Sequence, residues 1–185
     1  MRIELVLGLG NPGEQYDRTR HNTGFRVVDE IQRRQGGGLW VRRGSCELAI
    51  TTFGRWVALA QPFTFMNRSG GAAAELLADL EIGPASMLVV VDDVDLPLGT
   101  LRLRPSGGPG THNGLRDLCR TVGTGFPRLR VGVGGGGQPA DLAAYVLSAF
   151  DPDELETVEK MVARAADATE FAIREGLERA MNRYN

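Results

Sequence analysis

The sequence predicts a single α/β domain in which helices flank a mixed, twisted β-sheet. Short apolar runs, typical of buried strands, alternate with segments of helical periodicity along the 185 residues. No internal repeat or low-complexity linker divides the chain, and a hydrophobic content of 42% is enough for one core. The 25 glycines are concentrated between the periodic segments, where strands and helices are connected.

A strand, a glycine-rich loop and a helix are predicted at the start of the chain. The apolar residues 3–7 run directly into the loop at 8–13. Asn22 is a good N-cap, and the helix that follows it is predicted to end at the glycines of 36–38. The apolar face of this helix consists of Phe25, Val28 and Ile31. A three-stranded meander is predicted at residues 40–43, 46–53 and 55–61.

Helices and strands continue to alternate in the rest of the chain. Helices are predicted at residues 67–80 and 112–122, buried strands at 87–91 and 129–133, and an edge strand at 101–104. A long final helix is predicted to follow Asp151, an N-cap residue, with Pro152 at the first helical position and Glu154 completing a capping box. Gly176 is its predicted end. Its buried face is predicted to consist of Leu155, Val158, Val162, Ala165, Thr169 and Ala172.

The net charge of −2 hides an uneven distribution of charge. Residues 1–130 hold 16 of the 21 basic residues and 13 of the 23 acidic ones, whereas residues 131–185 are strongly acidic. Every basic residue except Lys160 is arginine, and a guanidinium fork suits phosphate recognition. Because a compositional bias explains arginine over lysine equally well, the segregation of charge is the stronger indication of a polyanionic partner.

Membrane insertion, disulfide formation and zinc binding are not expected. No apolar run approaches the ~18 residues that span a bilayer, and the N-terminus lacks a signal-peptide pattern. We therefore expect a cytoplasmic protein. Cys46 and Cys119 lie far apart and outside any metal-binding spacing, so both are predicted to be buried, reduced side chains.

The glycine spacing in residues 8–13 matches the fingerprint of a dinucleotide-binding loop. Such a loop needs a helix that begins inside the glycine run, so that its amides hold the pyrophosphate. Here Pro12 favours an extended chain, and residues 14–20 are polar without an apolar helical face. The candidate ribose acids, Asp29 and Glu30, fall on the helix. We therefore predict no nucleotide cofactor, with a nucleotide-dependent oxidoreductase kept as an alternative.

Histidine is the best candidate for chemistry. No serine lies in a nucleophile elbow, and neither cysteine has a neighbouring histidine, so a covalent nucleophile is not indicated. The two histidines, His21 and His112, each precede an asparagine at a predicted loop–helix junction, after a glycine-containing loop. A structural role for either histidine remains an alternative at this point.

Four sequence blocks occur in order over most of residues 3–134. They are GLGNPG with the following Tyr16 and Thr19-Arg20-His21-Asn22, FTFMNRSG at 63–70, DDVDLPLG at 92–99, and GGPGTHNGL at 107–115 with the strand at 128–134. These blocks resemble the signatures of bacterial-type peptidyl-tRNA hydrolases. The resemblance implies an esterase that uses an activated water, without a metal or cofactor, to release peptide from tRNA.

The resemblance also implies residue roles. His21 would be the general base, Asp92 would orient it and stabilise the imidazolium, and Asn11 would read the peptide part of the substrate. A positioned imidazole supplies about 10²- to 10⁴-fold in rate, enough for an activated ester. Taken alone, each residue has a structural alternative, such as a turn asparagine or a loop cap. The residues implied to line the cleft around the peptide and the 3′-terminal nucleotide are Tyr16, Phe65, Asn67 and Asn113.

Two arginines are the predicted contacts to the acceptor stem. Arg102 and Arg104 alternate with leucines on the predicted edge strand, so both side chains should leave the same face of the sheet. We expect this face to bind tRNA phosphates, and we expect the protein to act as a monomer. A solvated edge strand, whose arginines only prevent sheet-to-sheet pairing, is the alternative.

The sequence departs from the family pattern before His112. Thr111 stands where a glycine usually precedes the His-Asn pair, and Pro109 lies in the same loop, which predicts a stiffer and bulkier loop. A second functional hypothesis is a non-catalytic, RNA-binding relative, similar to splicing factors derived from these hydrolases. The retention of His21, Asp92, Asn11 and Asn67 favours the enzyme.

Overall fold

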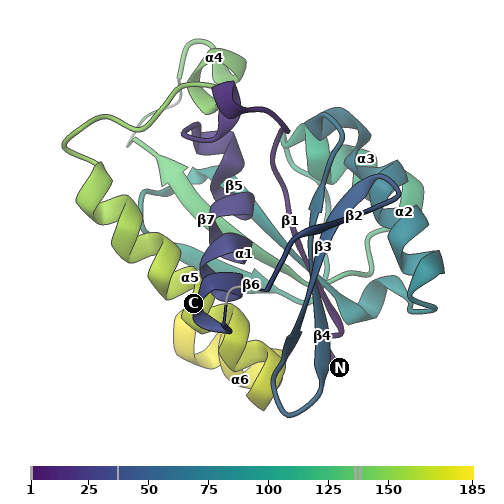
Figure 1. Cartoon of the computed structure of the whole chain (residues 1–185). Helices are drawn as coiled ribbons and strands as arrows, with labels where there is room; N and C mark the ends of the chain where they lie inside the picture. Colours follow the sequence, from purple (N-terminus) through teal and green to yellow (C-terminus); the bar gives the residue numbers. More distant parts are fainter. Residues whose placement is uncertain (1, 37, 136, 138) are drawn as a thin grey trace.

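A seven-stranded mixed β-sheet forms the centre of the computed structural model, and helices cover both of its faces (Figure 1). The strands are β1 (Leu5–Gly8), β2 (Val41–Arg43), β3 (Cys46–Thr52), β4 (Trp56–Pro62), β5 (Met87–Pro97), β6 (Leu101–Arg104) and β7 (Arg128–Gly134). Their order across the sheet is β2-β3-β4-β1-β5-β7-β6. The structure describes residues 2–36, 38–135, 137 and 139–185, and the predicted α/β class is confirmed.

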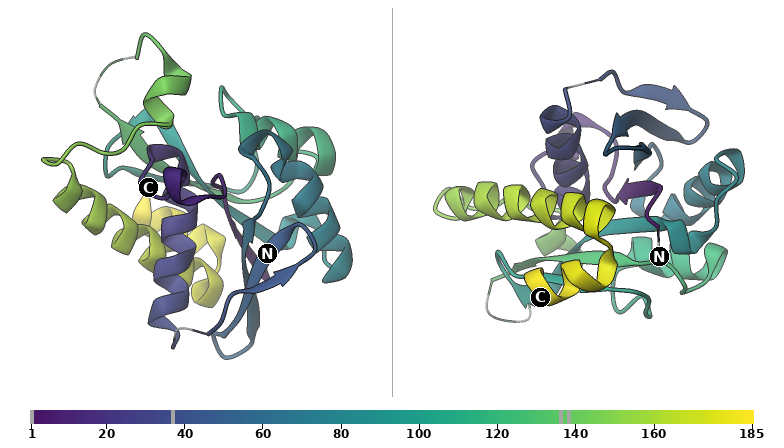
Figure 2. Two further views of the ribbon diagram at one scale, coloured as in Figure 1. Left: turned by 45° about the horizontal axis from the view of Figure 1, so that its top comes forward. Right: turned by 90° about the horizontal axis from the view of Figure 1, so that it is seen from below.

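Helices pack on the sheet as two separate layers. The helices are α1 (Thr23–Arg34), α2 (Ser69–Asp79), α3 (Asn113–Val122), α4 (Leu142–Val146), α5 (Leu155–Glu175) and α6 (Leu177–Tyr184). Short 3₁₀ turns are η1 (Glu14–Tyr16), η2 (Arg20–Asn22), η3 (Met66–Arg68) and η4 (Pro84–Ser86). One hydrophobic cluster joins α1 and α5 to the sheet, and a second joins α2 and α3 to its opposite face. Figure 2 shows α5 and α6, coloured green to yellow, packed together beside the purple α1.

The parallel strands at the centre of the sheet explain where the loops meet. Strand β1 pairs in parallel with β4 on one side and with β5 on the other, and β5 pairs in parallel with β7. These central strands are buried on both faces, as their continuous apolar runs predict. Because the carboxyl ends of parallel strands lie at one edge, the loops that follow β1 and β4 meet the polar end of β5 there.

Most predicted elements are confirmed, with several differences, one of which is the separate C-terminal helix α6, which was not predicted. Strand β5 continues to Pro97, past its predicted end, because the polar segment after Val91 still pairs with β7. The predicted helix start is wrong, because residues 152–154 form a turn and the N-cap of α5 is Glu154, not Asp151. Leu155, predicted to be buried, is therefore the first residue of α5 and is 47% exposed. The short α4 is an element that the sequence patterns did not indicate. The glycines of 36–38, predicted to end the first helix, include Gly37, which lies outside the described residues.

The two cysteines are in different environments. Cys46 is buried, and burial raises the pKa of its thiol to about 12. Cys119 is only half-buried, which corrects the prediction that both side chains would be buried. Both thiols are free. Among the described residues, no helix is both long and apolar enough to cross a membrane.

Candidate active site

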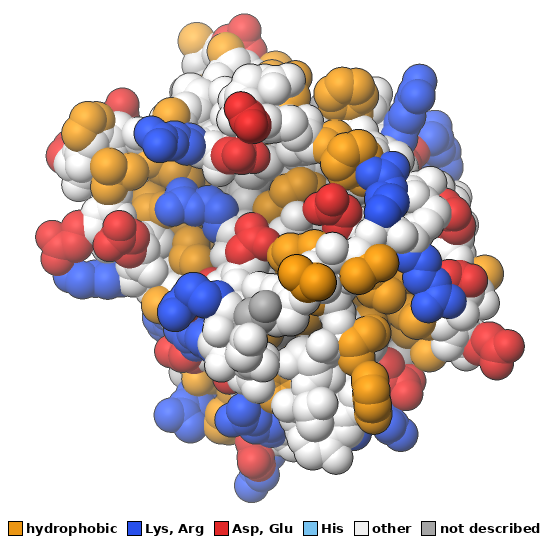
Figure 3. Space-filling model, viewed as in Figure 1, with side chains coloured by type: hydrophobic (Ala, Val, Ile, Leu, Met, Phe, Trp, Pro, Cys, Tyr) orange, Lys and Arg blue, Asp and Glu red, His pale blue; other side chains and the backbone are white. Residues whose placement is uncertain are grey.

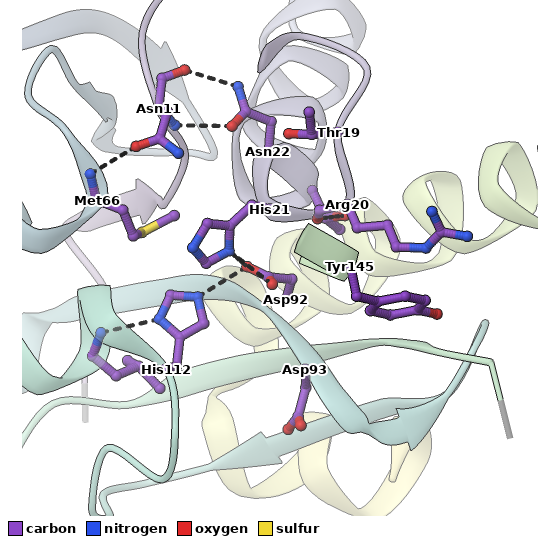
Figure 4. Close-up of polar contacts among 12 residues, drawn as sticks. Asn11, Thr19, Arg20, His21, Asn22, Met66, Asp92, Asp93, His112 and Tyr145 are labelled. Atoms are coloured by element: carbon purple, nitrogen blue, oxygen red, sulfur yellow. Dashed lines mark hydrogen bonds and ion pairs between the residues drawn. The ribbon is translucent and has the colours of Figure 1, made fainter. Parts of the chain in front are cut away.

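Asp92 is shared by the two histidines of the chain (Figure 4). His21 Nδ1 lies 3.0 Å from Asp92 Oδ2 and 3.1 Å from Oδ1, and His112 Nε2 lies 2.9 Å from Oδ1. The two imidazole rings are 4.8 Å apart between their centroids. Asp92 is 3% exposed and His21 is 7% exposed. Three segments distant in the sequence, η2, β5 and the start of α3, therefore converge on one buried carboxylate.

The carboxylate determines which ring nitrogen of each histidine faces it as a hydrogen-bond donor. Burial alone would raise the pKa of Asp92, but the charge and hydrogen bonds of His112 and His21 outweigh it and hold that pKa well below its usual range. An ionised carboxylate only accepts hydrogen bonds, so the facing nitrogens, His21 Nδ1 and His112 Nε2, both donate. In the neutral imidazole, donation from Nδ1 leaves His21 Nε2 without a proton and able to accept one. No described residue hydrogen-bonds that nitrogen, which faces away from Asp92 in Figure 4.

His112 is a part of the site that the sequence analysis left without a role. It is the N-cap of α3, and its Nδ1 accepts a hydrogen bond of 3.2 Å from the Leu115 backbone N–H. This bond explains why His112 presents its Nε2–H to Asp92. The available signal was the second His-Asn pair at a loop–helix junction, which matches the pair at His21.

His21, Asp92 and His112 are also grouped closely enough to be considered as ligands for a metal ion. One ligand atom from each of His21, Asp92 and His112 lies within 4.8 Å of the others. A metal at His112 Nε2 would require a lone pair on that nitrogen, while the Leu115 amide already requires one on Nδ1. Neutral imidazole cannot offer both. The hydrogen bonding of His112 therefore fits a proton-bearing cluster and does not fit a metal centre.

Asn11 is held in place from two sides. Its backbone N–H donates to Asn22 Oδ1 and its carbonyl accepts from Asn22 Nδ2, both at 2.9 Å. Its side-chain Oδ1 accepts from the Met66 backbone N–H at 2.8 Å. Asn22 occupies the N-cap position of α1, but its side chain makes no capping bond there, because it is used to hold Asn11. The Asn11 NH₂ group has no hydrogen-bond partner among the described residues, so a donor is left for a ligand.

The other residues predicted to line the site are more exposed than this cluster, and Tyr16, Phe65 and Asn67 do not line the cleft described below. The Tyr16 ring packs edge-on against Phe65 at 6.5 Å, and Phe65 is 55% exposed, so it is not a core side chain. Asn67 is exposed on η3. Asn113 is exposed at the start of α3, where its Oδ1 accepts from Arg116 at 2.8 Å. Both amides are thus available to a ligand.

A cleft of about 730 Å³ opens beside the shared carboxylate. Of the predicted residues, the cleft is lined by His21, Asp92, Asn113 and Arg104. Asn11 lines a separate hollow of about 120 Å³. The walls of the cleft are the loop 106–111 on one side and α4 on the other. The α4 residues in the wall are Leu142, Ala143 and Val146.

Strand β6 is an edge strand, as predicted, and its arginines leave the face opposite to the buried Leu101 and Leu103. Arg102 is half-buried, and Arg104 is exposed and reaches the cleft. In the antiparallel register Arg102 faces Arg130 of β7. Arg130 pairs with Asp93, so one acid partly offsets this cluster of positive charge. Figure 3 shows arginine and lysine side chains scattered over the face that carries α1 and α5.

Arg128, across from Arg104 in the same register, has a structural role. It is 2% exposed and lies over the Phe126 ring. Its guanidinium donates to the backbone carbonyls of Gly108, Thr124 and Phe126. Because Arg128 bonds to Gly108, it fixes the base of the loop that precedes His112. Thr111 in that loop is exposed and is one of the residues that line the cleft.

The glycine fingerprint at 8–13 has a packing explanation. A Cβ at Gly8 would lie 2.4 Å from the carbonyl oxygen of Gly24, and one at Gly10 would lie 2.7 Å from the Phe25 ring. These glycines let α1 pack closely on the end of β1. The polar segment after the loop forms the three-residue turn η1 instead of a long helix. The structure therefore lacks the helix N-terminus that a pyrophosphate site requires at this loop.

Comparisons with known proteins agree along the whole chain. A family profile described as peptidyl-tRNA hydrolase matches residues 5–185. The peptidyl-tRNA hydrolase of Chloroflexus aurantiacus is 49% identical over 184 residues, which are 98% of each chain. That of Aquifex aeolicus is 41% identical and covers 100% of this chain and 97% of its own length. The crystal structure of peptidyl-tRNA hydrolase from Acinetobacter baumannii superposes with a TM-score of 0.92 at 32% identity, covering 99% of this chain and 94% of that chain.

Proposed function

This chain belongs to the peptidyl-tRNA hydrolase family, and we propose that it hydrolyses the ester bond between a peptide and the 3′ end of tRNA. The observation that supports this proposal best is the pairing of His21 with the ionised Asp92, which leaves Nε2 of the imidazole free beside a cleft. A base without a nucleophilic serine or cysteine nearby suits hydrolysis by water.

In the proposed mechanism, His21 Nε2 removes a proton from a water that attacks the ester carbonyl. The imidazolium that forms keeps its Nδ1–H on Asp92, whose negative charge stabilises it. His112 donates a second hydrogen bond to the same carboxylate and keeps Asp92 ionised and in place. Collapse of the tetrahedral intermediate releases the ribose oxygen of tRNA, which takes the proton back from His21.

Uncharged amide groups are proposed to bind the reacting carbonyl. The free NH₂ of Asn11 and the exposed amides of Asn67 and Asn113 donate hydrogen bonds without adding charge, so His21 stays able to accept a proton. The Tyr16 and Phe65 rings offer an apolar surface to the peptide or to the terminal base. We further propose that the active unit is a monomer and that it works in the cytoplasm.

The direct test is turnover of N-blocked substrates. The purified protein is expected to release peptide from formyl-methionyl-tRNA or diacetyl-lysyl-tRNA and to leave unblocked aminoacyl-tRNA nearly intact. Binding of these tRNAs without turnover would instead indicate the non-catalytic, RNA-binding alternative, which no comparison supports.

Asn11→Asp is expected to reduce the preference for peptidyl over aminoacyl ester. The carboxylate can still accept from the Met66 N–H, but it loses the NH₂ donor that would hold the peptide carbonyl. A free aminoacyl group carries an ammonium, which a carboxylate attracts. The measurement is the ratio of kcat/KM for acetylated and free aminoacyl-tRNA of the same residue. An unchanged ratio would exclude Asn11 from substrate selection.

The arginine cluster at the sheet edge is proposed to bind the acceptor stem. Arg102 of β6 and Arg130 of β7 lie opposite each other on neighbouring strands. Such a like-charge pair is unfavourable without a nearby anion. Asp93 supplies only one negative charge, on Arg130. Phosphates of the stem would compensate the rest, and Arg104 links this cluster to the cleft that holds His21.

The double substitution Arg102→Ala, Arg104→Ala is expected to weaken binding of all tRNAs alike while kcat stays within about twofold, since neither side chain touches the ester. The log–log dependence of KM on salt should become shallower by about 0.7 to 0.9 for each lost phosphate contact. KM measured from low to physiological salt checks this. A normal KM with an unaltered salt slope would place the stem on another surface.

A further inference from the structure

Arg20, the residue before His21, is a buried cation that the mechanism above does not use. It is 3% exposed. Its Nη1 donates to the backbone carbonyl of Ala149 and, at 2.9 Å, to Ser148 Oγ. Its Nη2 donates to Glu154 Oε2 at 2.5 Å. All of these partners lie more than a hundred residues further along the chain, between α4 and α5.

The guanidinium of Arg20 is also enclosed by aromatic rings. Its Cζ lies 4.6 Å from the Tyr145 ring centre and 4.9 Å from that of Phe150. Figure 4 shows the Arg20 side chain extending away from His21 toward Tyr145. The Tyr145 hydroxyl in turn donates to the Val133 carbonyl at 2.7 Å, at the end of β7. These contacts therefore fix the position and orientation of the Arg20 side chain.

Backbone hydrogen bonds also connect η2 to the segment between α4 and α5. The Arg20 N–H donates to the Ser148 carbonyl at 3.0 Å, and Thr19 forms an isolated antiparallel bridge with Ala149. On its other side η2 is held by the Asn22–Asn11 bonds. A three-residue 3₁₀ turn has few hydrogen bonds of its own, so its orientation depends on such outside contacts.

Stability alone is a poor explanation for this arrangement. Two aromatic rings would pack as well around an apolar side chain, whereas a buried guanidinium has a large desolvation cost even when it is paired. The Nε of Arg20 is buried without a partner among the described residues, so its hydrogen bonding is incomplete. Unlike an apolar side chain, the guanidinium donates hydrogen bonds in fixed directions, because its fork is planar. It therefore fixes the angle between η2 and the segment after α4.

We propose that Arg20 is a positioning residue of this active site. It holds η2 so that His21 Nδ1 stays on Asp92 while Nε2 faces the cleft. The proposal rests on the role of His21 as the base. A displacement of about 1 Å in a catalytic group costs on the order of 10²-fold in rate, so a loosened turn should lower kcat before it lowers binding.

Arg20→Lys tests the proposal, because lysine keeps the charge and the aliphatic stem but loses the planar fork. We expect kcat to fall about 10-fold or more, with KM within about twofold of the parent value. In ¹H–¹⁵N spectra the His21 Nδ1–H proton, which is hydrogen-bonded to Asp92, should be visible in the parent protein and broadened in the variant. Glu154→Gln, which removes the carboxylate partner of the guanidinium, replaces Arg20→Lys if that variant does not fold.

Arg26→Lys is the matched control. Arg26 of α1 lies over the same Phe150 ring, at 5.8 Å, but bonds to none of the groups that hold η2. We expect it to keep the parent kcat and the His21 signal. Parent-like kcat and His21 signal in Arg20→Lys would overturn the proposal, as would equal losses in both variants. Loss of the signal in Arg20→Lys, combined with full turnover in His21→Ala, would show that Arg20 holds His21 on Asp92 but would overturn the assignment of the base and, with it, the role of Arg20 in catalysis.

Discussion

Replacing His21 by alanine is expected to lower kcat by about 10²-fold or more while KM for peptidyl-tRNA changes little. The base acts on the water in the transition state, so its loss does not remove contacts to the bound substrate. Single-turnover hydrolysis of a diacetyl-lysyl-tRNA, measured together with tRNA binding, separates the two effects. Comparable turnover in His21→Ala would disprove the mechanism.

His112→Ala is the control for this experiment. It removes the other imidazole from the same carboxylate, but His112 Nδ1 is committed to the Leu115 amide and its Nε2 bears the proton on Asp92. His112 therefore has no free lone pair with which to act as a base. We expect a smaller loss of kcat than in His21→Ala. A larger loss would exchange the roles of the two histidines.

Asp92→Asn is expected to lower kcat by about 10- to 100-fold, less than the loss of His21. An amide has one acceptor atom in place of the two carboxylate oxygens that face the histidines. Its NH₂ group would either oppose the His21 Nδ1–H or favour the other tautomer, in which Nε2 carries the proton and cannot act as a base. The imidazolium would also lose its counter-charge.

Asp93→Asn separates this effect from a general loss of negative charge. Asp93 accepts from the Asp95 backbone N–H at 3.0 Å and pairs with Arg130, and it contacts neither histidine. We expect its kcat to stay within a few-fold of the parent value. Equal damage from the two substitutions would mean that Asp92 is not the carboxylate that supports the base.

The pH dependence of stability gives an independent readout for Asp92. Its pKa is depressed in the folded protein, so its ionised form stabilises the fold above the unfolded value of about 3.9. That contribution is lost as pH falls through the lower folded pKa. The difference in free energy of unfolding between the parent protein and Asp92→Asn should therefore be largest at neutral pH and shrink below about pH 4. Urea unfolding at several pH values measures it.

Much of the fold could be predicted from sequence because local patterns determine it. The continuous apolar runs of β1 and β5 indicate central parallel strands, and the alternating leucines and arginines of β6 indicate an edge. Gly176 ends α5 in a left-handed conformation, φ 94°, which glycine adopts without strain. The polar end of β5 was missed, because pairing with β7 extends the strand where local propensity would end it.

The residue types of the site could also be predicted from the sequence. His21, Asp92 and Asn11 carry the resemblance to the family, and the structure brings His21 and Asp92 into contact. The catalytic roles of these residues remain proposals that the variants above test. The hydrogen bonds from the Asn22 side chain to Asn11 could not be predicted from the sequence. Asparagine before a helix is usually a cap, and this side chain meets Asn11 only in the folded protein.

The sequence by itself determined the α/β class, the family and the set of polar residues available for chemistry. Only the tertiary structure decided that Asp92 serves two histidines, that Arg128 is buried while Arg104 is exposed, and that Arg20 ties its turn to a segment more than a hundred residues away. The physical reason is that helix and strand patterns depend on neighbours in sequence. Protonation, burial and hydrogen-bond partners depend on groups that meet only when the sheet assembles.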